Sequence, residues 1–198
     1  RQRQMCIRDR YNENQQQIAK PSGSEAGIIK GAYLLDEVGK KGPRVRLLGS
    51  GPILKYVLEA AHRISAEYGV SSEVWSVTSY GELRRLGLED ERKNRLDPSK
   101  THTPYVSECF GDETPTVATS DYIASVPEMI QRWVGGRFVV LGTDGFGRSD
   151  SREALRSFFE IDTTSIMIAA LSALEQEGEV PEGTVTVSYT HLTLPTIC

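Results

Sequence analysis

Short apolar runs alternate with helical stripes of apolar residues along most of the chain, from Glu25 onward. Short runs rich in β-branched and aliphatic residues, bounded by glycine, proline or polar turns, favour strands over helices. The expected strands are Ala32–Leu35, Val45–Leu48, Glu73–Thr78, Thr116–Thr119 and Phe138–Leu141.

Between these runs, apolar residues recur at the spacing of one helix face, as in the stripe that contains Val57, Ala61 and Ile64. The segment GELRRLGLEDERKNRL, by contrast, is so charged that we expect an exposed helix there. The expected helices lie near Gly27–Lys30, from Pro52 to Gly69, at Gly81–Leu96, at Tyr105–Phe110, after Ser120 or Asp121, at Arg152–Phe159 and from Asp162 to Gly178.

Several helix ends carry residues with known capping preferences. Pro52 suits a first turn, and Gly69 suits the left-handed conformation that follows a last turn. Ser120 or Asp121 is expected to cap a helix that Pro127 must then kink or restart. The other expected caps and stops are Ser149–Ser151, Asp162 and Gly178.

The alternation of strands and helices predicts an α/β fold. Strands that are short and continuously apolar indicate a sheet covered on both faces, and such sheets are parallel or mostly parallel. We therefore expect a three-layer α/β/α sandwich of about five mostly parallel strands, built from residues 25–185 as one domain. The polar residues 11–24, with QQQ and PSG, indicate an extended arm or linker.

The two ends of the chain differ from this body and mirror each other in the genetic code. If residues 4–10 are written CAG ATG TGT ATA AGA GAC AGn, the reverse complement encodes VSYTHL, which is residues 187–192. The match continues outward through residues 1–3 and 193–195. An inverted adapter flanking an insert behaves in this way, and the string looks like the transposon-end adapter of sequencing libraries. We therefore expect residues 1–10 and 186–198 to be adapter-derived, and exclude them from the fold.

Charge and cysteine content narrow the function. The formal net charge is −4, and it becomes −7 once the first ten residues, with four arginines against Asp9, are left out. A mildly acidic chain without a basic stripe argues against nucleic-acid and membrane partners. Only Cys109 lies outside the two end segments, so a disulfide framework is excluded and a reducing, cytoplasmic setting is expected. No apolar run reaches the roughly 20 residues of a membrane span.

Two weaker candidate sites each have a simpler interpretation. LLGSGPIL places a Gly-x-Gly between a strand and a helix, where backbone amides can bind an anion, but Leu54 occupies the third glycine position of the dinucleotide motif. A simple tight turn is the favoured interpretation of that motif. Cys109 and His102 suggest a nucleophile and a base, but no third group is placed beside them, so a structural cysteine is the favoured interpretation.

The stretch LGTDGFGRSDSR, Leu141 to Arg152, is the most informative candidate. It sets glycines around Phe146 and then Arg148 at the carboxyl end of an apolar strand, where ligands bind in open α/β sheets. Arg148 has the geometry to bind a carboxylate or phosphate through two hydrogen bonds. Alternatively, Phe146 and Arg148 pack on another chain or domain, while Asp150 or Ser151 caps the following helix. Spacing alone leaves both interpretations open.

A family resemblance rests on this loop and on four other strings. VLGTDGFGRSDSREALRSFFEID, LLGSGPIL, EVWSVTSYGELRR, RVRLLGSG and YNEN closely resemble the C-terminal region of the homodimeric pyruvate dehydrogenase subunit family. The resemblance covers nearly all of residues 11–185, and it implies the fold of the transketolase C-terminal domain.

The resemblance implies a parent enzyme that uses thiamine diphosphate and Mg²⁺ to decarboxylate pyruvate and to acetylate lipoyl groups reductively. The implied partners are a second copy of the subunit and the lipoyl-bearing acyltransferase. In such enzymes the cofactor lies between the first two domains. The resemblance therefore implies no catalytic, cofactor-binding or metal-binding residue in this chain. The implied role of this domain is assembly and dimer packing, with Gly145, Phe146, Gly147 and Arg148 as contact residues.

Three functional hypotheses therefore remain. The first is a non-catalytic fragment of a thiamine-dependent 2-oxo acid dehydrogenase. The second is a free-standing anion-binding module that uses the loop from Gly142 to Arg148. The third is a thiol hydrolase built on Cys109.

Overall fold

The computed structural model describes residues 18–186 of the 198-residue chain. The expected adapter segments, residues 1–10 and 186–198, lie outside the described residues except for Thr186. Residues 11–17 of the expected arm lie outside them as well.

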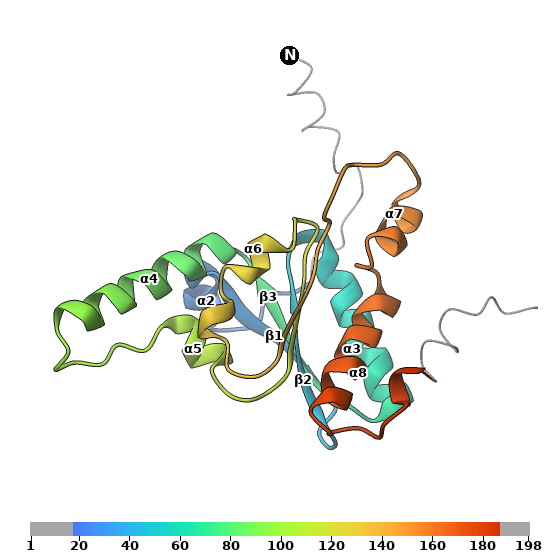
Figure 1. Cartoon of the computed structure of the whole chain (residues 1–198), viewed down its shortest axis with the longest axis horizontal. Coiled ribbons are helices and arrows are strands. Elements are labelled where there is room, and N and C mark those ends of the chain that lie inside the picture. The colour runs from blue at the N-terminus through green and yellow to red at the C-terminus, as the bar shows by residue number, and fades with distance from the viewer. Residues whose placement is uncertain (1–17, 187–198) are drawn as a thin grey trace, which may run out of the picture.

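A five-stranded sheet forms the middle layer (Figure 1). Its strands are β1 (Ala32–Val38), β2 (Arg44–Gly49), β3 (Ser71–Val77), β4 (Thr116–Thr119) and β5 (Phe138–Leu141). Their order is β1-β3-β2-β4-β5, and every neighbouring pair is parallel except β1 with β3. The expected number of strands and the mostly parallel arrangement are confirmed.

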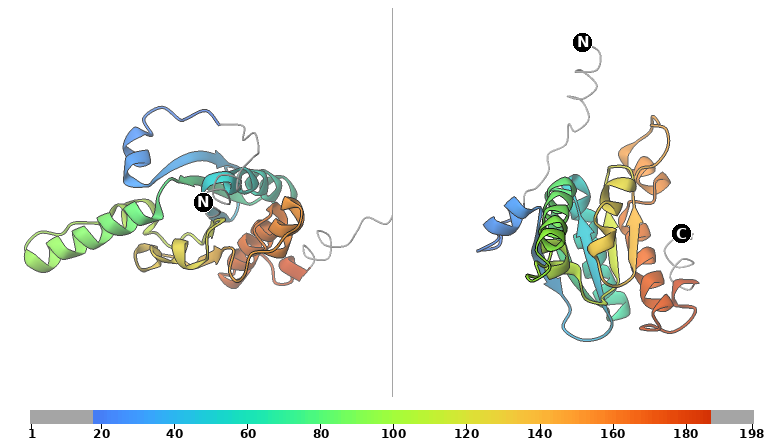
Figure 2. Two further views of the ribbon diagram at one scale, coloured as in Figure 1. Left: turned by 90° about the horizontal axis from the view of Figure 1, so that it is seen from above. Right: turned by 60° about the vertical axis from the view of Figure 1, so that its left-hand side comes forward.

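Helices cover both faces of the sheet (Figure 2). One face carries α3 (Leu54–Tyr68), which follows the 3₁₀ turn η1 (Gly51–Ile53), and α8 (Thr163–Gln176). The opposite face carries α4 (Tyr80–Leu96), α5 (Tyr105–Phe110), α6 (Ser125–Glu128) and the 3₁₀ turn η2 (Gln131–Trp133). Two short helices stand at the margins, α2 (Glu25–Lys30) before β1 and α7 (Arg152–Phe158) beyond β5.

The sheet separates two apolar cores. Residues of β2, β3 and β4 alternate between them, as Leu47 faces α3 and α8 while Leu48 faces α4 and α5. This alternation is the period of two that a pleated strand imposes. Strands apolar at consecutive positions are therefore buried on both faces, as the sequence pattern predicted.

One apolar stretch, Arg152–Gln176, has the length and composition of a membrane span among the described residues. It consists of two helices, because α7 ends at Phe158 and α8 begins at Thr163. The side chains of Ile166, Met167 and Leu171 are fully buried against the sheet and α3. Core packing accounts for the apolar character of this stretch.

Most expected caps are confirmed. Asp162 Oδ1 accepts the Ser165 N–H at 2.9 Å at the start of α8, and Ser151 Oγ accepts the Ala154 N–H at 3.2 Å at the start of α7. Gly69 ends α3 with a φ of 65°.

The expected cap by Ser120 or Asp121 is wrong. The helix α6 begins only at Ser125, because Ser120 Oγ lies 2.8 Å from Ser50 Oγ of the neighbouring loop and caps no helix. The Asp121 carbonyl accepts a hydrogen bond from Thr143 Oγ1 at 2.8 Å instead of starting a helix. As expected, Pro127 coincides with an interrupted helix: α6 spans four residues and η2 follows it.

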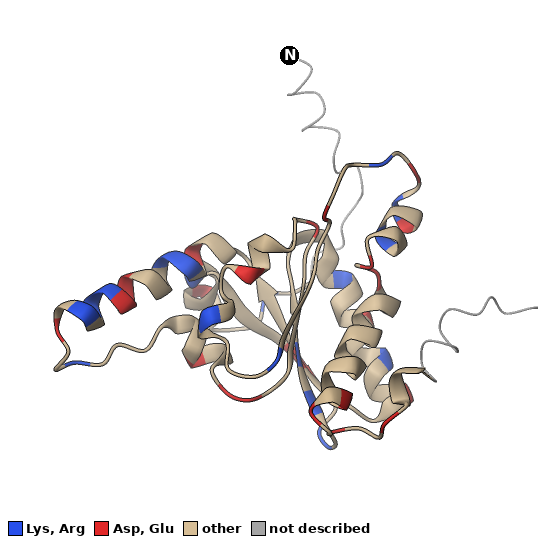
Figure 3. Ribbon diagram, in the orientation of Figure 1, with Lys and Arg blue, Asp and Glu red and all other residues tan. Residues whose placement is uncertain are grey.

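The helix α4 projects from the body of the molecule and carries charges along its length (Figures 1 and 3). Arg85 lies 2.6 Å from Glu82 and 3.2 Å from Glu89, and Lys93 lies 3.0 Å from Asp90. Exposed pairs of this kind contribute little stability each. They do confirm the expectation of a charged, exposed helix.

A buried arginine connects the central strands. Arg46 of β2 is only 2% exposed, and its Nε lies 2.8 Å from a carboxylate oxygen of Glu73 on β3. Its Nη2 lies 2.9 Å from Asp112, which precedes β4. Partial burial opposes ionisation of Asp112, but the hydrogen bonds from Arg46 outweigh it and lower the pKa of that carboxyl group. The Glu73 carboxylate also accepts hydrogen bonds from the Arg44 guanidinium and from Trp75 Nε1–H, the latter at 3.2 Å.

Removing one partner of this network should cost more than removing both. We expect Glu73→Leu to lower the free energy of unfolding by about 3 kcal/mol, because Arg46 then keeps a buried charge with Asp112 as its remaining carboxylate. Adding Arg46→Met should recover part of that loss. Urea unfolding gives the free energy of unfolding of both variants. The control is Glu67→Gln, which removes an exposed ion pair with Arg63 and should change stability by less than about 0.5 kcal/mol. Additive losses in the double variant would contradict the expected coupling.

The carboxylate of Glu175 fixes the segment that follows α8. It accepts the Gly183 N–H at 3.0 Å and the Val185 N–H at 2.9 Å. These backbone hydrogen bonds, first that from Val185 and then that from Gly183, lower the pKa of the Glu175 carboxyl group below its usual range. Because the folded pKa lies below the unfolded one, the stabilisation is complete above the unfolded pKa and is lost as the pH falls through the folded one.

A pH series should reveal this contribution. We expect Glu175→Gln to melt at a lower temperature than the original chain at neutral pH, and the difference to shrink as the pH falls below about 4.5. Thermal unfolding followed by circular dichroism gives both melting temperatures. Glu179→Gln is the control, because it removes an exposed carboxylate whose side chain has no hydrogen bond or ion pair within the described part of the chain, and a pH-independent difference for Glu175→Gln would rule out the carboxylate as the cause.

Candidate functional site

The loop after β5 is bound to the loop after β4. Thr143 donates its N–H to the Tyr122 carbonyl at 2.9 Å and its hydroxyl to the Asp121 carbonyl at 2.8 Å. In return, Asp144 Oδ1 accepts the Ala124 N–H at 3.1 Å. The two loops therefore form one unit at the carboxyl end of the sheet.

Gly142 stands where these loops approach most closely. A Cβ atom there would lie 2.5 Å from the Ala124 nitrogen and 2.7 Å from the Ala124 Cα. Backbone atoms cannot move aside as a flexible side chain can, so this position requires glycine. A glycine that looked like part of a ligand loop in the sequence is thus explained by packing.

The four expected contact residues divide into two groups. Phe146 is 96% exposed and takes no part in the crevice described below. Gly145, with a φ of 92°, Gly147 and Arg148 line that crevice. The guanidinium carbon of Arg148 lies 4.0 Å from the centre of the Phe158 ring, a cation–π contact with α7.

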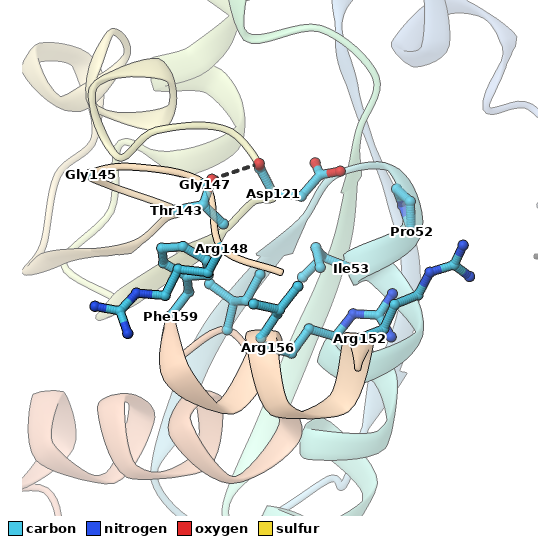
Figure 4. A pocket seen from close by; sticks show the side chains of 12 residues that line it. Pro52, Ile53, Asp121, Thr143, Gly145, Gly147, Arg148, Arg152, Arg156 and Phe159 are labelled. Carbon is cyan, nitrogen blue, oxygen red and sulfur yellow. Dashed lines mark hydrogen bonds between the residues drawn. The ribbon is translucent and has the colours of Figure 1, made fainter. Parts of the chain in front are cut away.

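The crevice lies between the loops after β2, β4 and β5 and the helix α7 (Figure 4). Its volume is about 390 Å³, which is within the range of small-molecule sites. Its apolar lining comes from the start of the β2 loop and from the α7 region, namely Pro52, Ile53, Leu155, Phe159 and Ile161.

The polar lining is mostly cationic. Arg152 and Arg156 of α7 join Arg148, against the single carboxylate of Asp121. Arg156 donates to the Tyr56 hydroxyl of α3, and its guanidinium carbon lies 4.7 Å from the centre of that ring. In Figure 4 the guanidinium of Arg148 points away from the other side chains that line the crevice.

The sequence interpretation identified only part of this crevice. Pro52, Ile53 and Asp121 line it because β2 and β4 are neighbours in the sheet, which brings the loops after these strands together. The order of the strands could not be predicted from the sequence. The contribution of α7 had a signal that could have been used: Arg148, Arg152 and Arg156 recur every four residues, the spacing of one helix face.

The Gly-x-Gly of LLGSGPIL serves the turn between β2 and α3. A Cβ atom on Gly49 would lie 3.0 Å from Leu54 and from Val57, so the glycine permits close packing of α3 on the strand. Gly51 has a φ of 53°, and Ser50 Oγ lies 2.8 Å from Ser120 Oγ across the two loops. The geometry accounts for this motif as a tight turn.

The structure gives the Cys109–His102 pair no support. Cys109 is half-buried on α5, where desolvation raises the pKa of its thiol, and its polar neighbour is the Tyr105 hydroxyl. His102 forms backbone hydrogen bonds with the Asn94 side chain, at 2.7 and 2.8 Å. A thiol that stays protonated and has no adjacent imidazole is a poor nucleophile.

Residues 18–186 contain no group of three or more His, Cys, Asp or Glu side chains arranged to bind a metal ion.

An unsuitable side chain at Gly142 should separate the two loops. We expect Gly142→Ala to cost about 1–3 kcal/mol of stability, because its Cβ meets the backbone of Ala124. Gly147→Ala is the matched control, since a Cβ there meets nothing within 4 Å. Urea unfolding distinguishes the two variants, and equal stability would contradict the close approach of these loops.

Comparison with known proteins identifies relatives along most of the chain. A family model described as the transketolase-like C-terminal domain matches residues 31–162. The "Pyruvate dehydrogenase E1 component" of Pseudomonas aeruginosa is 50% identical over 173 residues, which are 85% of this chain and 20% of that protein. The protein of the same name from Escherichia coli is 47% identical over 177 residues, with 88% and 20% covered. The chain thus spans about a fifth of the length of these curated relatives.

Solved structures share the fold at low identity. A transketolase from Leishmania mexicana superposes with a TM-score of 0.54 at 20% identity, covering 81% of this chain and 21% of that one. A mutant transketolase from Pichia stipitis gives 0.56 at 17% identity, covering 85% and 21%. The expected fold and the expected resemblance to the pyruvate dehydrogenase subunit are both confirmed.

Proposed function

Because the chain belongs to the family of transketolase-like C-terminal domains, we propose that it serves as the C-terminal part of a pyruvate dehydrogenase E1 component. The observation that carries this proposal is the 50% identity to such a protein along 85% of the chain. Similarity at this level, spread over the whole domain, reflects more than a shared fold.

The parent enzyme in this proposal decarboxylates pyruvate and reductively acetylates lipoyl groups. Its subunit pairs with a second copy in the cytoplasm and works with a lipoyl-bearing acyltransferase. Thiamine diphosphate and Mg²⁺ supply the chemistry of decarboxylation, and we assign both to parts of the subunit other than this chain. In this proposal residues 18–186 take no direct part in that reaction.

The role of this domain in the proposal is assembly. Phe146 is 96% exposed on the loop after β5. Three hydrogen bonds anchor the start of this loop to the loop after β4. Tyr122 and Ile123, exposed by 62% and 51%, lie on that neighbouring loop. Exposed apolar side chains gathered at one edge of a domain are typical of a contact surface. We assign this surface to contacts within the parent dimer.

A chimeric enzyme tests the role directly. The matched segment of the Escherichia coli relative, 177 residues long, is replaced by the corresponding residues of this chain. We expect a dimer that converts pyruvate in the presence of thiamine diphosphate, Mg²⁺ and the acyltransferase. In this chimera, Phe146→Ala should weaken dimer association by about 2 kcal/mol, roughly 30-fold, as loss of a central aromatic contact does.

Leu96→Ala is the matched control, because Leu96 is also an exposed apolar side chain, at 69%, but lies at the far end of α4. Sedimentation equilibrium gives the dissociation constants of both variants, and the acetylation rate reports the assembled enzyme. If Phe146→Ala and Leu96→Ala dimerise equally well, the loop is not a dimer contact. A folded chimera that lacks activity would contradict the assignment of the domain.

A further inference from the structure

The crevice occupies a topologically distinct place in the sheet. β2 and β4 are neighbours, but the chain leaves β2 toward α3 on one face and leaves β4 toward α6 on the other. The two loops therefore diverge at the carboxyl ends of adjacent parallel strands. Ligands of open α/β sheets bind in the crevice that such a divergence creates.

The lining of the crevice suits a particular class of ligand. Ile53, Leu155 and Phe159 offer an apolar surface that an aliphatic or aromatic group can cover. The volume of about 390 Å³ accommodates a small molecule and is too small for a folded partner. The apolar lining thus favours a ligand with a compact apolar body.

The positive charge of Arg148 suits a ligand whose other end is an anionic group. Its contact among the described residues is the Phe158 ring at 4.0 Å, and no carboxylate within the described part of the chain pairs with it. The contact with the Phe158 ring holds the guanidinium beside the crevice without using its N–H donors. An exposed side chain changes rotamer within nanoseconds, so these donors can turn over the mouth when an anion arrives.

The geometry points to a binding site for a small anionic ligand in this crevice. Arg148 binds the phosphate or carboxylate through paired hydrogen bonds, and Ile53, Leu155 and Phe159 contact the apolar body. Phe146 lies outside the crevice, so ligand binding and the proposed subunit contact use different parts of the same loop. The inference thus goes beyond the assembly role and does not depend on it.

Isothermal titration calorimetry on the full chain tests the site with four probes. Phenyl phosphate and benzoate carry the two anions on the same ring, phenol lacks the charge, and inorganic phosphate lacks the ring. We expect one anionic ring compound to bind one site at least tenfold more tightly than inorganic phosphate, and phenol to give no measurable binding. The stronger of phenyl phosphate and benzoate identifies the headgroup as phosphate or carboxylate.

Variants at Arg148 connect that binding to the crevice. Arg148→Gln should weaken binding of the preferred probe at least tenfold, the usual effect of losing a charged hydrogen-bond donor. Arg148→Lys keeps the charge without the planar fork and should lie in between. Arg84→Gln is the matched control, an exposed arginine of α4 without an ion pair in the described part of the chain, and should leave binding unchanged.

Both arginine sites, Arg148 and Arg84, are exposed, and circular dichroism verifies that each of the three variants keeps the fold. The inference is overturned if neither ring anion binds at up to about 10 mM, which corresponds to less than roughly 3 kcal/mol of binding free energy. It is also overturned if Arg148→Gln binds as tightly as the original chain, or if Arg84→Gln weakens binding equally. Equal binding of phenol would show that charge plays no part.

Discussion

The buried charge of Arg46 is the constraint on which the arrangement of the sheet depends. Its guanidinium cannot remain unpaired in an apolar interior, so Glu73 of β3 and Asp112 ahead of β4 must both lie within reach of it. Apolar side chains alone tolerate a sliding strand far better than a hydrogen-bonded ion pair does. The network thereby selects the pairing in which Arg46 lies opposite both Glu73 and Thr116.

Fixing β2 between β3 and β4 also fixes what happens at the other end of these strands. The loops after β2 and β4 begin side by side and diverge to opposite faces, and the Ser50–Ser120 hydrogen bond closes the base between them. The β5 loop then attaches to the β4 loop through Thr143. A crevice at this edge therefore follows from strand order, while its charge follows from the arginines of α7 and the preceding loop.

Much of the fold could be predicted because local signals and burial agree. β4, β5 and α5 match their expected boundaries residue for residue, since proline, glycine or a polar turn bounds each. β1 extends beyond its apolar run to Val38, because Asp36 and Glu37 lie on an edge strand and remain exposed. Its antiparallel direction has no local signal at all. The wrong cap at Ser120 has the same origin, because its partner Ser50 is distant in sequence.

Only the part of the candidate site that lies in the loop after β5 could be predicted from the sequence. The sequence left ligand binding and subunit packing as competing uses of Phe146 and Arg148, because the sequence does not fix the directions of two side chains on either side of a glycine in a loop. The structure gives the two side chains different surroundings: Phe146 projects into solvent, while Arg148 stacks on Phe158 beside the crevice. Glycines on both sides of Phe146 permit this divergence, and Gly145 adopts a φ of 92° that side-chain-bearing residues rarely adopt. The proposed interface and the proposed ligand site therefore use different side chains of one short loop.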